Sequence, residues 1–323
     1  MKMEKTVENE GSQEQNVSYD NDICFKCYFG GMDEDSQFLR NSMCEYAIGN
    51  GVKIVHSDVI NSEIIPDHLG KKKVILDIRA KDKQGRLYAI EMQKQPTQTD
   101  INRWEYYGAR NLTKQLNQGY EYAVIAPVYQ IIFTYRHENN NELINRYVMR
   151  NEHGQKEQQQ PLLNRIYINI SAIDAIVEEK GIDSLNEHEK IFYLFKNNGL
   201  CDTMKPGRMA NTIMDMYDNL KNDDEQWTMA QKIEEAEVRE RYAMEQYREE
   251  GKKEGREEGR EEGREEGKQE GRAEGTIIAT MNHVKKLMQK NHFSVEEAMD
   301  MLDVEETIRS VILEELQKQT DQK

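Results

Sequence analysis

The sequence lacks any long apolar segment. No stretch of the 323 residues approaches the roughly 20 consecutive apolar residues that a membrane-spanning helix needs, and charged residues make up 32% of the chain. Residues 1–18 are polar and acidic, and they contain no apolar region of the kind that secretory signal peptides carry. The sequence therefore predicts a protein that does not enter the membrane and is located in the cytoplasm.

A set of zinc ligands is also missing. Of the four cysteines, Cys44 and Cys201 are isolated, whereas Cys24 and Cys27 form a C-x-x-C pair. A zinc site would need a second pair of ligands at a suitable spacing, and the seven scattered histidines do not supply one. A thioredoxin-like role would need a βαβ context, which this segment lacks. We interpret these cysteines as reduced thiols packed by helices.

Positive charge is scarce overall but is concentrated in one region. The net charge is −16, which by itself argues against a partner rich in phosphate. Between residues 70 and 120, however, eleven Lys and Arg face five Asp and Glu, a local charge of +6, so the rest of the chain sums to −22. A basic region within an acidic chain is typical of a local site for a polyanion.

Helices and strands alternate in the first half of the chain, which predicts a mixed α/β domain. Thr99 is the expected N-cap of the second long helix, and a polar loop with Gly85 predicts a hairpin between two strands. The core order is then α-β-β-β-α-β. The expected elements are a short helix 22–30, a helix opened by residues 33–35 and ended by 49–51, strands 52–65, 74–80 and 87–93, helix 99–117 and strand 122–135.

The second half of the chain becomes increasingly helical. A hairpin is expected within residues 142–170, with Tyr147 and Met149 on one strand and Ile166, Ile168 and Ile170 on the other. The expected organisation is a disordered N-terminus 1–18, a core domain 19–170, a helical extension 171–250, a Gly-repeat segment 251–275 and a small helical tail 276–323.

The segment 251–275 repeats Gly at every fourth residue, with Glu, Arg and Lys between. Each Gly costs a helix about 1 kcal/mol relative to Ala, and Glu–Arg pairs three residues apart return only a few tenths of that. Two interpretations remain open. The segment is either a solvated, partly helical spacer, or a helix whose Gly stripe lets paired helices approach closely as a coiled coil.

Two acidic residues stand where a strand pattern predicts apolar neighbours. Asp77 lies among Val, Ile and Leu, and Glu91 follows fourteen residues later, across the expected hairpin. Alternation puts Glu91 and Gln93 on one face, and antiparallel pairing allows Asp77 to meet Glu91 there. Two close carboxylates repel each other unless a cation lies between them, and oxygen ligands favour Mg²⁺ or Mn²⁺. Such an ion polarises a phosphate and activates water.

Each acid also has an ordinary structural interpretation. Asp77 is explained equally well by a salt bridge, for example with Arg79, and Glu91 by a solubilising role on an edge strand. Their occurrence together at this spacing favours a site. Glu63, fourteen residues before Asp77, is either an outer ligand or a surface acid.

Basic residues near these acids are candidates for contact with a nucleic-acid backbone. The helix expected over 99–117 carries several of them along roughly one face, and the alternative is a solvated flank of that helix. The candidate DNA-binding residues are Lys71, Lys72, Lys73, Arg79, Arg103, Tyr107, Arg110 and Lys114.

Several motifs, spread over about residues 20–275, together resemble those of a known family. They are Asn21-Asp22-Ile23-Cys24-Phe25-Lys26, Leu76-Asp77-Ile78-Arg79-Ala80, Ile90-Glu91-Met92-Gln93, Arg103 with Tyr106-Tyr107, Gln115-Leu116 with Gly119-Tyr120, and the Gly-Arg-Glu-Glu repeats. The chain is similar to the Rpn family of recombination-promoting nucleases or putative transposases, within the PD-(D/E)XK nucleases. This resemblance implies a restriction-endonuclease-like α/β core with an α-helical C-terminal region, in which Asp77 and Glu91 bind metal.

The resemblance further implies a metal-dependent DNA endonuclease of low sequence specificity, linked to recombination or mobile elements. Gln93 takes the place of the signature lysine, and a neutral amide cannot give positive charge to the developing phosphorane. Two alternatives follow. One is a catalytically weak or inactive nuclease fold that forms homo-oligomers through its C-terminal helices and serves as an interaction module. The other is a DNA-binding module that does not cleave.

Overall fold

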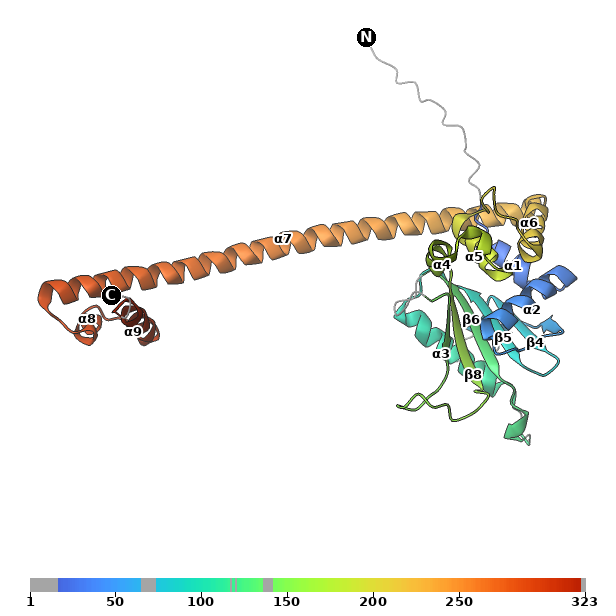
Figure 1. Ribbon diagram of the computed structural model, residues 1–323, viewed down its shortest axis with the longest axis horizontal. Helices are drawn as coiled ribbons and strands as arrows, with labels where there is room; N and C mark the ends of the chain where they lie inside the picture. Colours follow the sequence, from blue (N-terminus) through green and yellow to red (C-terminus); the bar gives the residue numbers. More distant parts are fainter. Residues whose placement is uncertain (1–16, 65–73, 117, 120, 136–141, 321–323) are drawn as a thin grey trace, which may run out of the picture. The chain divides into compact units, whose positions relative to one another are not determined.

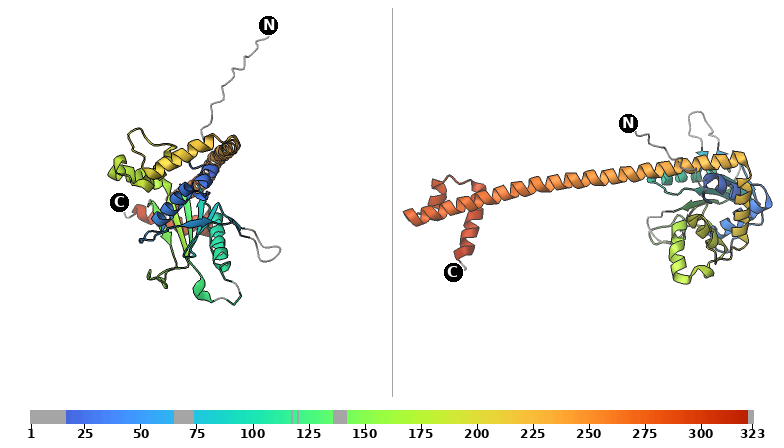
Figure 2. Two further views of the ribbon diagram at one scale, coloured as in Figure 1. Left: turned by 90° about the vertical axis from the view of Figure 1, so that its right-hand side faces the viewer. Right: turned by 90° about the horizontal axis from the view of Figure 1, so that it is seen from above.

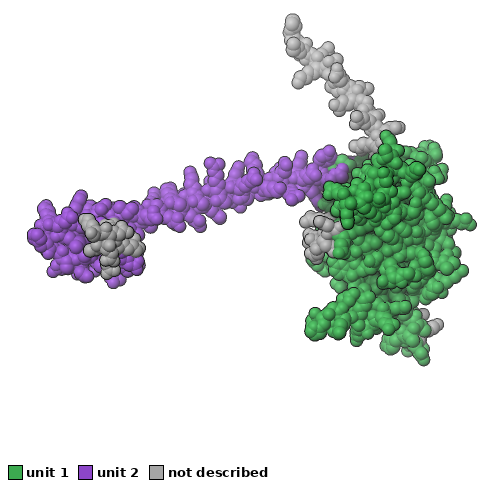
Figure 3. Space-filling view, viewed as in Figure 1, with its two compact units in different colours: residues 1–238 green, residues 239–323 purple. Residues whose placement is uncertain are grey.

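The computed structural model describes residues 17–64, 74–116, 118–119, 121–135 and 142–320. The chain divides into two compact units, residues 1–238 and 239–323, which are coloured separately in Figure 3. Helix α7 (Asp224–Asn291) begins in the first unit and continues in the second. Across the described ranges, no helix combines the length and apolarity needed to cross a membrane.

A six-stranded mixed sheet forms the centre of the first unit. Its strand order is β1-β4-β5-β6-β8-β7, in which β5, β6 and β8 run parallel and the remaining neighbours pair antiparallel. Strands β2 and β3 form a separate two-stranded sheet. The strands are β1 Ser57–Val59, β2 Glu63–Ile64, β3 Val74–Ile75, β4 Ile78–Asp82, β5 Leu87–Met92, β6 Val128–Thr134, β7 Ile144–Tyr147 and β8 Leu163–Asn169.

Helices cover both faces of this sheet, as Figures 1 and 2 show. The larger core cluster joins α1, α2, α5 and α6 to one face, and the smaller one joins α3 to the other through Trp104 and Ala89. The mixed α/β architecture confirms the predicted fold class. The helices of this unit before α7 are α1 Asp22–Gly30, α2 Glu34–Ile48, α3 Gln98–Thr113, α4 Ile173–Lys180, α5 Glu187–Asn197 and α6 Arg208–Lys221, with 3-10 turns η1 Tyr122–Val124, η2 Ile170–Ala172 and η3 Ile182–Ser184.

The helix starts follow from their capping residues. The side chain of Asn21 accepts a hydrogen bond from the backbone N–H of Ile23 at the start of α1, and Asp33 accepts one from Ser36 in α2. Both helices have the predicted extents. The prediction that Thr99 caps α3 is wrong, because Thr97 forms a capping box with Asp100 and starts the helix two residues earlier.

Three predicted strands are shorter than expected. The run 52–65 supplies only β1 and β2, with irregular chain before and between them. The run 74–80 is split by a bend at Asp77, where the chain leaves the small sheet and enters the large one. In the run 122–135, β6 begins only after Pro127, because Ala126 exchanges both backbone hydrogen bonds with the side chain of Gln115.

The hairpin predicted within residues 142–170 is confirmed. Strand β7 pairs antiparallel with β8, so that Tyr147 lies opposite Arg165 and Ile144 opposite Ile168. Met149 lies beyond the end of β7, and Ile170 starts the 3-10 turn η2. Strands β7 and β8 are consecutive in the chain and adjacent in the sheet, with β7 at its edge, so a single long loop connects them.

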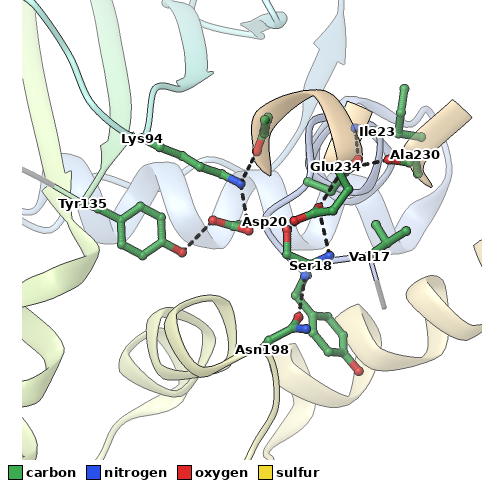
Figure 4. Close-up of polar contacts among 12 residues, drawn as sticks. Val17, Ser18, Asp20, Ile23, Lys94, Tyr135, Asn198, Ala230 and Glu234 are labelled. Atoms are coloured by element: carbon green, nitrogen blue, oxygen red, sulfur yellow. Dashed lines mark hydrogen bonds and ion pairs between the residues drawn. The ribbon is translucent and has the colours of Figure 1, made fainter. Parts of the chain in front are cut away.

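Most of the predicted disordered segment 1–18 lies outside the described residues. Its last two residues are packed: Val17 is buried, and the backbone N–H and hydroxyl of Ser18 donate to the carboxylate of Glu234 in α7 (Figure 4). Asn21 donates to the same carboxylate and to the carbonyl of Ala230. These contacts fix the first turns of α7 to the start of the domain.

The second unit has a small core of its own. The end of α7 packs with α8 (Val295–Met301) and α9 (Glu306–Thr320) around Val284 and Ile312. Ser294 caps α8, as the sequence predicts, with Glu297 completing a capping box. The Gly repeat 251–275 is helical throughout and exposed, and a Cβ added at any of its seven glycines meets no described atom within 4 Å.

A buried arginine connects α1, α2 and β1. Arg40 is 1% exposed, and its guanidinium donates to the carbonyls of Phe29, Gly31 and Ser57 and to the Ser57 hydroxyl at 2.8–3.0 Å. We expect Arg40→Met to lower the free energy of unfolding by about 2–4 kcal/mol, because the buried carbonyls lose their donor. Chemical denaturation monitored by circular dichroism measures this change.

Lys53→Met is the matched control, because it removes the same charge from an exposed pair with Glu45. Exposed ion pairs contribute about 0–1 kcal/mol, so this variant should unfold close to the parent protein. Equal destabilisation by the two substitutions would contradict the structural role of Arg40.

Candidate active site

Asp77 lies at the bend between β3 and β4, at the end of β4 in the large sheet. Ile78 pairs with Ile90 in the antiparallel register, which continues to put Asp77 opposite Glu91. The Oδ2 atom of Asp77 accepts a hydrogen bond from the backbone N–H of Met92 at 3.2 Å. The bend therefore holds this carboxylate against the end of β5.

Glu91 and Gln93 lie on the face of the sheet that α3 covers, as strand alternation predicts. The Nε1–H of Trp104 donates to Oε2 of Glu91 at 2.8 Å, and the carboxylate is 6% exposed. Gln93 continues the strand, because its N–H donates to the carbonyl of Phe133 in β6. Neighbouring residues of α3 thus contact Glu91 in β5 and Gln93 just after it.

Burial disfavours the charged form of both carboxylates. Burial and, to a smaller extent, the negative charge of Asp77 raise the pKa of Glu91 to about 7, against the hydrogen bond from Trp104 and the charge of Arg103. The pKa of Asp77 is also raised by burial, with Lys26 opposing the shift. A cation would stabilise this pair of one buried and one half-buried acid.

Lys26 is a member of the site that the sequence analysis did not assign. Its ammonium lies 2.8 Å from Oδ2 of Asp22 and 3.6 Å from Oδ1 of Asp77. The Asp22–Lys26 spacing of four residues was visible as a helical ion pair. Only the packing of α1 against the sheet brings that pair to Asp77.

Arg103 joins the site from α3. Its Nη2 lies 3.2 Å from Oε1 of Gln93, 3.9 Å from Oε2 of Glu91 and 3.3 Å from Oδ1 of Asp100. The guanidinium also lies near the rings of Trp104 and, at 5.9 Å, Tyr107. A positive charge is therefore held beside Gln93.

The two carboxylates fit a hard divalent cation. Among the described residues, no three His, Cys, Asp or Glu side chains gather as metal ligands, so the protein offers Asp77 and Glu91. Mg²⁺ accepts this arrangement, because it is commonly held by one or two carboxylates while water and phosphate oxygens complete its octahedral shell. The burial of Glu91 and the strand register that brings Asp77 opposite it favour an ion here.

The other candidate residues are dispersed around this centre. Glu63 lies in β2 opposite Ile75, on the small sheet that leads to Asp77. Arg79 donates to the side chain of Asn111 in α3 and to the carbonyl of Asn61, whereas Asp77 pairs with Lys26, so the salt bridge considered between Asp77 and Arg79 is replaced by these contacts.

Along α3 the candidate residues differ in exposure. Tyr107 is 8% exposed and belongs to the core cluster with Trp104, so it packs beneath Arg103. Arg110 lies two turns after Arg103 and is half-buried, and Lys114 is exposed at the C-cap of the helix. The three lysines Lys71, Lys72 and Lys73 lie outside the described residues.

Lys94 belongs to a different cluster, as alternation predicts. Its ammonium lies 3.2 Å from Oδ1 of Asp20 and 2.8 Å from Oε2 of Glu237 in α7, and Asp20 accepts a hydrogen bond from the hydroxyl of Tyr135 (Figure 4). These two carboxylates bind the ammonium, so Lys94 cannot replace the lysine that the site lacks.

Replacing Glu91 tests its buried charge without any assay of activity. In the absence of metal, a raised folded-state pKa contributes stability below about pH 4.5 that is lost as the pH rises through about 7. We expect Glu91→Gln to be more stable than the parent at pH 8 by about 2–3 kcal/mol, and the difference to shrink towards pH 5. Urea denaturation across this pH range measures it.

Mg²⁺ should act in the opposite direction. At pH 8 a saturating concentration should raise the melting temperature of the parent protein and leave Glu91→Gln nearly unchanged, because binding to the native state alone is stabilising. A parallel pH dependence of the two proteins would show that Glu91 is ionised without strain and would contradict the geometry described above.

Comparisons with known proteins identify the family of the chain. No curated protein and no solved structure matches the chain. Residues 19–250 match the family model described as PD-(D/E)XK nuclease family transposase, a match that includes the whole sheet, the carboxylate pair and helix α3. PD-(D/E)XK nucleases typically use divalent metals, and membership suggests a nuclease that acts on DNA. On this match, the chain belongs to the family of PD-(D/E)XK nuclease transposases.

Proposed function

We propose that the protein is a metal-dependent DNA endonuclease that hydrolyses phosphodiester bonds with low sequence specificity, in recombination or the movement of mobile elements. The observation that carries this proposal is the position of Asp77 opposite Glu91 at one end of β4 and β5, in a chain of a nuclease family. Asp77 and Glu91 are the proposed metal ligands, and Glu63 a possible outer one.

The side chains around the site have separable tasks in this reaction. A bound Mg²⁺ or Mn²⁺ supplies the Lewis acid that polarises the phosphate and activates water. The N–H of Met92 and the indole of Trp104 orient the two carboxylates. Because Oε1 of Gln93 accepts from Arg103, its amide NH₂ group is the donor that Gln93 offers to a phosphate oxygen or to the attacking water.

Basic residues near the site are proposed to hold the DNA backbone. Arg110 and Lys114 follow Arg103 along α3 and provide positive charge away from the carboxylates. Residues 71–73 precede β3 and therefore precede Asp77 by only a few residues. Arg79 is tied to Asn111, and Tyr107 is buried, so both are proposed to support this surface from below.

The tail suggests a second property, self-association. Helix α7 continues through the Gly repeat, whose side chains are exposed and are mostly Glu, Arg and Lys. We propose that two such helices pair in a coiled coil, with the glycines permitting close approach and opposite charges meeting across the pair. The same pairing would serve a catalytically weak member as an interaction module.

Plasmid cleavage tests the enzymatic proposal. The parent protein should nick supercoiled plasmid in the presence of Mg²⁺ and not with EDTA. Asp77→Asn and Glu91→Gln should each lower the nicking rate by at least about 100-fold, because each removes a charged ligand while keeping the side-chain shape. Gel analysis of nicked and linear products measures the rate.

Asp183→Asn is the matched control, since Asp183 is an exposed acid in η3, outside the proposed site. It should cleave like the parent protein. If both Asp77→Asn and Glu91→Gln cut plasmid at the parental rate, the assignment of the metal ligands is wrong.

Light scattering tests the proposed self-association. The full chain should have a molar mass that is a multiple of the 37.9 kDa monomer, and a chain ending at residue 250 should have the mass of a monomer. The salt dependence of the association should be strong, because Glu–Arg pairs at the surface are screened by salt. A monomeric full chain at micromolar concentration would contradict pairing through α7.

A further inference from the structure

We propose that Arg103 supplies to the scissile phosphate the positive charge that a signature lysine would supply, and that Gln93 is its positioning residue. The inference rests on the proposed nuclease function and assigns two roles within it. The site contains Gln93 at the position where a lysine is expected, and a neutral amide cannot stabilise the charge that develops on phosphorus. The contact between Gln93 and α3 provides an alternative source of that charge.

The geometry of Arg103 carries the argument. Its Nη2 donates to Oε1 of Gln93 at 3.2 Å and lies 3.9 Å from Oε2 of Glu91. A phosphate whose oxygen binds an ion held by Asp77 and Glu91 would therefore lie within reach of the guanidinium.

The surroundings of the guanidinium favour interaction with an anion. The side chain is 37% exposed and lies near the rings of Trp104 and Tyr107. Its Nε is buried, and no atom of the described residues accepts a hydrogen bond from it. The exposed part of the guanidinium is the part that a phosphate can reach, and a phosphate oxygen is the kind of acceptor that the planar fork of arginine binds best.

Among the described residues, Lys26 is a second cation near the carboxylates, but its contacts indicate a different task. Its ammonium binds Asp22 and Asp77, on the side of the site that α1 covers. It therefore balances the charge of one proposed metal ligand. Arg103 contacts Gln93, whose side chain follows Glu91 on the same face of the sheet, and so is the cation positioned towards the phosphate.

Cleavage kinetics with the full chain test the proposal. At saturating Mg²⁺ and protein, we expect Arg103→Gln to lower the single-turnover rate of plasmid nicking by ~100-fold, with the protein concentration at half-maximal rate changed less than ~3-fold. Arg103→Lys should retain more of the rate, because it keeps the charge without the bidentate fork. Lys83→Gln, in the turn at the opposite end of β5, removes one positive charge and should cleave like the parent protein.

Restoring the lysine distinguishes a charge at the phosphate from a structural role. Gln93→Lys in the Arg103→Gln background should recover the rate by at least ~10-fold, because the ammonium then stands at the signature position. A side chain that only supports α3 would not be rescued by a substitution on β5. Melting temperatures of all variants, measured in parallel, monitor folding.

The results distinguish a failure of the role of Arg103 from a failure of the nuclease function. If the parent protein cleaves plasmid and Arg103→Gln cleaves at the same rate, the role of Arg103 is wrong and the nuclease function stands. If Arg103→Gln is slow and Gln93→Lys recovers nothing, Arg103 is structural and the inference is equally wrong. Absence of Mg²⁺-dependent cleavage by the parent protein would overturn the proposed function and this inference with it.

Discussion

The site depends on one constraint, the forced proximity of Asp77 and Glu91 at the end of two antiparallel strands. Their register opposes two acids, and burial makes ionisation of both unfavourable, as the pKa of about 7 for Glu91 indicates. The folded domain therefore needs contacts that offset the free-energy cost of holding these two carboxylates close together. Here they come from a backbone N–H, the Trp104 indole and the charges of Lys26 and Arg103, and a divalent ion between the two carboxylates would stabilise the pair further.

Helix α3 connects this constraint to the rest of the domain. Trp104 is fully buried and anchors the helix on the sheet, and the same residue donates to Glu91. Arg103, its neighbour in sequence, is thereby fixed beside Gln93. Adjacent residues of α3 therefore anchor the helix and contact the site. A displacement of α3 would move the hydrogen-bond donor of Glu91 and the positive charge of Arg103 together.

Much of the fold could be predicted because local signals and tertiary structure agree. The extents of α1 and α2 and a strand over most of residues 87–93 are as predicted. Prediction failed where a local pattern was overridden. The strand around Asp77 looks continuous, yet it is divided between two sheets, and Thr99 looks like a cap although Thr97 and Asp100 satisfy the helix start better. The apolar periodicity of a segment does not specify which strand it pairs with, nor which of two nearby residues caps a helix.

The sequence by itself determined that two acids and Gln93 share a face near a hairpin, because strand alternation and a short loop fix these relations locally. It also determined the helical tail and the capping of α8. Only the tertiary structure decided which charges surround the acids. Lys26 arrives from α1 and Arg103 from α3, each through packing on opposite sides of one sheet, and contacts between elements distant in sequence depend on that packing, which no local pattern specifies.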